Sequence, residues 1–223
     1  MINTIKYIAI TLLVAGCATN KLQPAIYSKS DIVDIESITI DFSQPISHLS
    51  IDHSSASKDP GLLMQTISIW AKNKASKEIE EVLPLFDTVD NRKHVENFII
   101  DYLCDSLKSM CVESGGDASL LVTPIFVGFR FDQLSNLKYL PTYVFDIELQ
   151  KNGIVLFKHI IGAGNLFHIN GVQKTGVRPE FGYKNPIQII ENREEALSRM
   201  EEVMRELSQE IVIFFSDSSQ RNI

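Results

Sequence analysis

The chain has 223 residues, a mass of 25.1 kDa and 44% hydrophobic residues, so it can bury the core of one sizeable domain. This composition excludes an intrinsically disordered, collagen-like or disulfide-dense protein. The 21 basic residues face 28 acidic ones, a formal net charge of −7, and no basic run is present, which argues against a nucleic-acid partner.

The N-terminus has the pattern of an export signal. An apolar run, Tyr7 to Ala15, follows Lys6 and is about half as long as a bilayer-spanning helix. It ends in Val14-Ala15-Gly16-Cys17, which resembles the lipobox of bacterial lipoproteins. The resemblance implies a signal peptide over 1–16.

The same resemblance implies that Cys17 carries lipid, a diacylglycerol on its thiol and an acyl chain such as palmitate on its amino group. Several acyl chains give stable anchoring, whereas one is marginal. Because Ala18 stands where an aspartate would retain a lipoprotein in the inner membrane, the expected location is the outer membrane, facing the periplasm. The alternative is an ordinary thiol at Cys17.

The mature chain is expected to be a tether over residues 17–30, a single periplasmic domain over 31–217 and a disordered tail over 218–223. The domain opens with a strand that ends at Phe42, and a polar loop over 43–60 follows. Two loop histidines, His48 and His53, have no ligand spacing around them, so we expect solvated side chains and no metal site.

Two helical regions come next. Asp59-Pro60 is a helix-start signal, and helical spacing runs to the polar stretch 72–77. A second short turn is predicted over 78–83, ended by Pro84. A long amphipathic helix is then predicted from Asp90 as its cap to just before Gly115-Gly116.

Three strands are predicted in the centre of the chain. The first covers 118–131, with alternating residues Leu121 to Phe131 on one face and an edge or bulge at Pro124. The others, 143–150 and 154–161, flank Asn152-Gly153, which is the pattern of a two-residue hairpin turn.

A two-residue turn predicts the register of the hairpin, with Leu149 opposite Leu156. The same register places Asp146 opposite His159, a pair that we interpret as a surface ion pair and not as a catalytic dyad, because no nucleophile stands beside it.

Residues 162–186 are glycine-rich and predicted to be irregular, and they form our candidate partner-binding loop. The alternative is a mobile excursion with no role. The closing helix is predicted from Asn192, with Glu195 completing a capping box. The candidate contact residues in the loop are Asn165, Phe167, His168, Arg178, Phe181 and Tyr183.

This order of elements predicts an α+β fold, a mostly antiparallel sheet of about four strands with two or three helices packed on one face. The stretch from Asn91 to Phe215, with Asp117-Ala118 at a strand start and Lys151-Asn152-Gly153 at a turn, resembles the small periplasmic domain of envelope-assembly lipoproteins. That group includes the curli secretion lipoprotein, the lipopolysaccharide-assembly lipoprotein, activators of penicillin-binding proteins and the N-terminal domain of the Tol-system propeller protein. Its members act by binding, so the resemblance implies no catalytic residues and no cofactor.

The expected function is therefore a non-enzymatic outer-membrane lipoprotein that binds a protein partner in a cell-envelope complex. The alternative is a carrier of lipid or glycan, with an apolar groove formed by phenylalanines of the strands. The phenylalanines are Phe126, Phe129, Phe131, Phe145 and Phe157, although strand aromatics more often belong simply to the core.

With Cys17 assigned to lipid, Cys104 and Cys111 remain as a pair in an oxidising compartment. Seven residues of regular helix rise about 10.5 Å, beyond the Cα limit of about 7 Å for a disulfide. The two can bond only if the helix ends near 108–110; otherwise they are two buried thiols.

Overall fold

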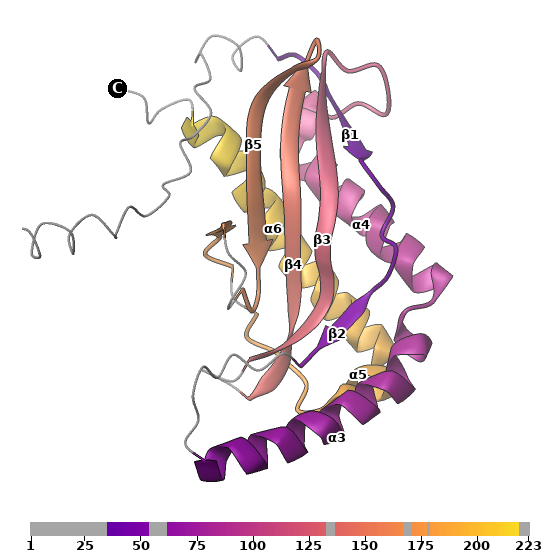
Figure 1. The fold of residues 1–223 in the computed structure, drawn as a ribbon. Coiled ribbons are helices and arrows are strands. Elements are labelled where there is room, and N and C mark those ends of the chain that lie inside the picture. The colour runs from indigo at the N-terminus through magenta and orange to yellow at the C-terminus, as the bar shows by residue number, and fades with distance from the viewer. Residues whose placement is uncertain (1–34, 54–61, 133–136, 167–170, 178, 219–223) are drawn as a thin grey trace, which may run out of the picture.

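The computed structural model describes residues 35–53, 62–132, 137–166, 171–177 and 179–218. The predicted signal peptide, Cys17, the tether and residues 219–223 lie outside this part of the chain. Within it, helices and strands follow one another as shown in Figure 1. The elements are β1 Ile38–Phe42, β2 Ser50–Asp52, α3 Leu62–Phe86, α4 Val89–Leu107, the 3₁₀ helix η1 Lys108–Met110, β3 Ala118–Asp132, β4 Lys138–Lys151, β5 Ile154–Ala163, β6 Val172–Lys174, α5 Pro186–Glu191 and α6 Arg193–Ser218.

The fold is α+β, and its sheet is mixed with six strands in the described residues. Strands β3, β4 and β5 form an antiparallel meander, whereas β1 and β2 both run parallel to β3, and β6 runs parallel to β5. The predicted four-stranded, mostly antiparallel sheet is thus only approximately right. Strands β2 and β6 were missed because each has three residues, too few for an alternating pattern.

Helices α4 and α6 lie against the same face of the sheet, and the main core lies between these two layers (Figure 1). The buried Tyr143 hydroxyl donates a hydrogen bond of 2.9 Å to the Met200 carbonyl, which ties β4 to α6. Helix α3 lies across one end of the sheet, where it packs against β2 and α5. In the described residues, no helix is both long and apolar enough to cross a membrane.

Helix α3 is longer than predicted, because it is one continuous helix with Pro84 in its last turn. The predicted break at 72–77 and the stop at Pro84 are wrong. A proline in the last turn lacks the N–H that would bond the carbonyl four residues earlier, so the turn needs other support. Phe86, which is fully buried against Phe129, holds this final turn in place. The next helix is capped by Thr88, whose Oγ1 accepts from the Asn91 N–H at 3.2 Å, and not by Asp90.

Strand β3 changes face halfway along. Its pairing with β4 shifts between Pro124 and Phe126, which confirms the irregularity predicted at Pro124. Before the shift the buried hydrophobic residues are even-numbered, and after it they are odd-numbered; at the shift itself Ile125 is 51% exposed. The prediction of one uniform inward face over 121–131 was therefore wrong in its first half.

The β4–β5 hairpin has the predicted two-residue turn, with positive φ at Asn152 and Gly153. A second shift between Leu149 and Gln150 moves the register by one residue, so Leu149 pairs with Phe157. The predicted register was wrong for this reason.

The shifted register also separates the predicted Asp146–His159 pair. His159 lies opposite Ile147, and burial lowers its pKa. Lys158 instead bridges the two acids of β4, with Nζ 2.7 Å from Glu148 and 3.6 Å from Asp146.

Candidate functional site: a groove between α6 and the segment before α5

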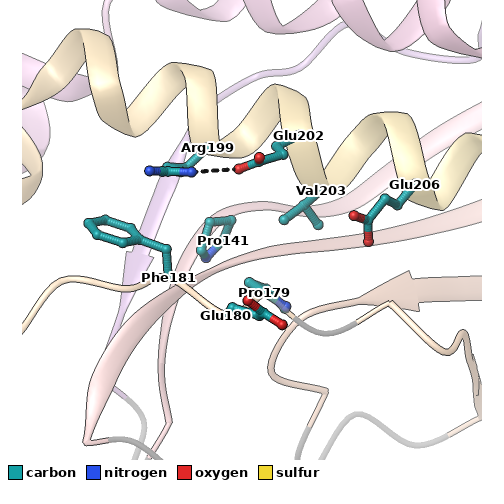
Figure 2. A pocket seen from close by; sticks show the side chains of 8 residues that line it. All are labelled: Pro141, Pro179, Glu180, Phe181, Arg199, Glu202, Val203 and Glu206. Atoms are coloured by element: carbon teal, nitrogen blue, oxygen red, sulfur yellow. Dashed lines mark hydrogen bonds and ion pairs between the residues drawn. The ribbon is translucent and has the colours of Figure 1, made fainter.

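A groove of about 480 Å³ lies between α6 and the segment 179–181, and we call it the α6 groove (Figure 2). One wall comes from α6, the other from the segment that leads into α5, and β4 contributes a single proline. Its lining consists of Pro141, Pro179, Glu180, Phe181, Arg199, Glu202, Val203 and Glu206.

The α6 wall follows from helical spacing. Arg199, Glu202, Val203 and Glu206 stand at i, i+3, i+4 and i+7, which places them along one helix face. Val203 is buried at the boundary with the core, whereas Glu202 and Glu206 are exposed. The wall therefore presents an apolar base with charged side chains above it.

The opposite wall is held by Gly182 and Tyr183. The N–H and carbonyl of Tyr183 exchange hydrogen bonds of 3.0 and 2.7 Å with Tyr139 of β4. A Cβ on Gly182 would lie 2.8 Å from the Tyr139 carbonyl oxygen, so only glycine permits this close approach. The neighbouring Phe181 is thereby fixed at the edge of the groove.

Phe181 is 36% exposed and is held from two sides. The Arg199 guanidinium carbon lies 4.7 Å from its ring centroid, a cation–π distance, and the Tyr183 ring meets it edge-on at 5.2 Å. Arg199 is in turn oriented by Glu202, at 2.9 Å, and by Glu195, at 3.6 Å. The hydrogen bond that Arg199 donates to Glu202 raises the pKa of Arg199 above its usual value, so this side chain stays cationic.

Tyr183 is structural. It is 4% exposed, its ring packs edge-on against Phe129 at 5.7 Å, and burial raises its pKa to about 12. Its hydroxyl has no hydrogen-bond partner in the described part of the chain. We assign it to the core beneath the groove and not to a contact surface.

Of the remaining candidate residues in the predicted loop, one is bound to the sheet and three lie outside the described residues. Asn165 is bound to the sheet elsewhere, with its side-chain amide donating to the Phe131 carbonyl at 2.7 Å and its N–H donating to Thr142 at 3.1 Å. Phe167, His168 and Arg178 lie outside the described residues. Of the six candidates, the structure therefore places Phe181 on the groove and gives Asn165 and Tyr183 structural roles.

The sequence reasoning missed the residues of α6 and Pro141. From the sequence, Arg199 indicates only an i,i+4 partner of Glu195 on the exposed face of the helix, and Val203 only a member of its apolar stripe. The spacing of the acids along α6 was a usable signal, but the opposite wall is about 20 residues away in the chain, and no local pattern connects the two.

Searches for relatives found no matching protein family, no matching curated protein and no matching solved structure. The site is therefore interpreted from its own residues.

Two other predicted features can be located. The structure bonds Cys104 to Cys111, with their Cα atoms 5.1 Å apart. Helix α4 ends at Leu107 and is followed by a 3₁₀ turn. This turn brings the Cα atom of Cys111 closer to that of Cys104 than a continuing regular helix would. The turn then places Cys111 beside Ile38 of β1.

The histidine prediction was half wrong. His48 is exposed, but the Nδ1 atom of His53 lies 2.6 Å from the Tyr139 hydroxyl, and its ring stacks 4.3 Å from that of Phe131. His53 is thus a packed side chain and not a solvated one. Within the described residues, no three His, Cys, Asp or Glu side chains are grouped so that they could hold a metal ion.

The phenylalanines proposed for a lipid groove do not line the described cavities. Phe129, Phe145 and Phe157 are at most 2% exposed and belong to the core. The α6 groove and two further cavities, one beside Leu85 and one beside Ile213, are lined by other residues. These three phenylalanines therefore pack the domain.

Proposed function

We propose that this protein is a non-enzymatic lipoprotein, anchored in the outer membrane through Cys17, that binds a protein partner at the α6 groove and supports a cell-envelope complex. The observation that carries the proposal is the fixed, exposed ring of Phe181 at the edge of a groove. Aromatic side chains beside a pocket are the usual anchors of protein interfaces.

The surroundings of Phe181 favour binding at low entropic cost. Ordering a free side chain at an interface costs about 0.5–1.5 kcal/mol. Arg199 and Tyr183 already hold the Phe181 ring, so a partner meets an arranged surface.

The chemistry of the lining also favours binding. The lining residues that the structure describes offer prolines, an aromatic ring, carboxylates and one guanidinium, and none of them is a serine, cysteine or histidine that could act as a nucleophile or proton relay. The location rests on the lipobox pattern at Val14-Ala15-Gly16-Cys17.

Site-specific photo-cross-linking in intact cells tests the docking surface. We replace Phe181 with p-benzoylphenylalanine and expect one discrete covalent adduct with another protein. Ile125, 51% exposed on the bulge of β3, is the matched control position and should give no such adduct. The proposal is wrong if Phe181 gives no adduct or gives the same adducts as Ile125.

A second experiment tests the anchor. The Cys17→Ser variant removes the thiol that would carry lipid, so the protein should leave the outer-membrane fraction and become extractable without detergent. Retention of the variant in that fraction would contradict lipid anchoring.

A further inference from the structure

The α6 groove has unbalanced charge. In the part of its lining that the structure describes, three carboxylates, those of Glu180, Glu202 and Glu206, accompany a single cation, Arg199. Arg199 is engaged by Glu202 and by Glu195 at the edge of the groove. Among the described residues, neither Glu180 nor Glu206 has an ion pair, so two carboxylates face the groove without a cation.

These two carboxylates come from opposite walls. Glu206 projects from α6, and Glu180 lies on the segment before α5, with Pro141 and Val203 between the walls (Figure 2). A ligand seated in the groove would therefore meet acid on both sides and an apolar base beneath. Glu202 and Glu206 are also like charges at i and i+4, an arrangement that destabilises an isolated helix.

We infer that the α6 groove binds a segment of the partner protein that carries a lysine or arginine next to an apolar residue. The cation lies between Glu180 and Glu206, and the apolar residue packs on Pro141 and Val203 beside the Phe181 ring. This inference rests on the proposed function and adds the chemistry of the partner.

Charge complementarity selects this occupant. An anionic headgroup or an acidic segment would enter a groove whose described lining already carries a surplus of two negative charges, from three carboxylates and one guanidinium. A purely apolar segment would remove the carboxylates of Glu180 and Glu206 from water without compensation. A cationic segment satisfies both carboxylates.

The test uses the full chain, purified from membranes in an uncharged detergent, and two synthetic peptides. One seven-residue peptide has two lysines flanking a tyrosine, and its matched peptide has glutamines in place of the lysines. Binding is followed by NMR through the backbone amide signals at about 150 mM salt, where screening beyond about 8 Å removes distant charge effects. We expect the lysine peptide to shift the signals of Phe181, Val203 and Glu206 and to bind about tenfold more tightly than the glutamine peptide.

A pair of matched double variants distinguishes the effect of the carboxylates in the groove from the effect of the protein's overall negative charge. Glu180→Gln with Glu206→Gln should weaken the lysine peptide about tenfold. Glu191→Gln with Glu194→Gln, which removes the same charge beside another cavity, should leave its affinity unchanged. Equal affinity for the two peptides, or equal loss in the two double variants, would overturn the inference.

The outcomes distinguish this inference from the proposed function. If Phe181 cross-links a partner but the two peptides bind alike, docking stands and the cationic chemistry is wrong. If the lysine peptide binds in the groove but Phe181 cross-links nothing in cells, the groove has the inferred chemistry and the proposed function is wrong.

Discussion

The carboxylate of Asp117 joins two segments that are 80 residues apart in the chain. Its oxygens accept hydrogen bonds from the N–H groups of Ser37, at 2.8 Å, and Glu36, at 3.3 Å, and lie 3.0 Å from Nζ of Lys151. These bonds hold the pKa of Asp117 well below its usual range, and the bond from the Ser37 N–H has the largest effect. The ionised form is therefore the one that the folded state prefers.

The lowered pKa gives a pH dependence with a definite sign. Because the folded pKa lies below the unfolded value of about 3.9, the stabilisation is fully present above about pH 5 and is lost as the pH falls toward the folded pKa. We expect Asp117→Asn to lower the urea midpoint at pH 6 and to have a smaller effect at pH 2.5. Asp101→Asn, which removes an exposed carboxylate of α4, is the control; an equal loss for Asp117→Asn at both pH values would refute the assignment.

Gly128 is a position where the backbone itself demands glycine. Its φ is +148°, and a Cβ there would lie 1.9 Å from the Ser50 carbonyl oxygen on the neighbouring strand β2. We expect Gly128→Ala to lower the free energy of unfolding by about 2–4 kcal/mol, because β2 must move away from β3. Gly176→Ala, where a Cβ meets nothing within 4 Å, should change it by less than about 0.5 kcal/mol. Similar losses in the two variants in urea denaturation would show that the contact with β2 is unimportant.

At the scale of elements, the Cys104–Cys111 disulfide closes the end of α4 onto the segment that leads to β3. A loop of this length is expected to stabilise the fold by about 2–3 kcal/mol through the entropy of the unfolded chain. The double variant Cys104→Ser with Cys111→Ser should lose that amount, and dithiothreitol should destabilise the original chain and leave the double variant unchanged. Thiol titration of the denatured, unreduced protein is the direct check, since two free thiols would exclude the bond.

The elements also show what the sequence could and could not predict. The helices α4 and α6 and the strands β3, β4 and β5 follow from long periodic runs, and the end of α4 was anticipated as the condition for the disulfide. The consequences of the bulges near Pro124 and Leu149 were harder to predict. Each bulge inserts one residue, so the side chains beyond it point to the opposite face of the sheet. The α6 groove was not predictable, since segments 179–181 and 199–206 are brought together by tertiary contacts alone. Tyr183 is bonded to the Tyr139 backbone and packed on Phe129, and Phe181 then lies against Arg199.

At the scale of the whole molecule, strand β1 joins the sheet through a pairing between segments that lie far apart in the chain. Strand β1 pairs in parallel with β3, and α3 and α4 lie between them in the sequence. Ile38 is 3% exposed, pairs with Ala118 and accepts a 3.0 Å hydrogen bond from the N–H of Val112 through its carbonyl. The β4–β5 hairpin, in contrast, forms across a two-residue turn, and Leu149 is buried within it. Closing the longer loop costs more entropy before any contact is gained.

This difference in loop length predicts which substitutions change the folding rate and which change the unfolding rate. We expect Ile38→Ala and Leu149→Ala each to destabilise the protein by about 2–4 kcal/mol, because both remove buried methyl groups. Because the loop to β1 is longer, we expect β1 to dock after the hairpin has formed. Ile38→Ala should then mainly accelerate unfolding, whereas Leu149→Ala should mainly slow refolding. Stopped-flow measurements in urea separate the two rates. If Ile38→Ala instead slows refolding as much as Leu149→Ala does, then β1 is already paired in the transition state and the parallel contact across 80 residues forms early.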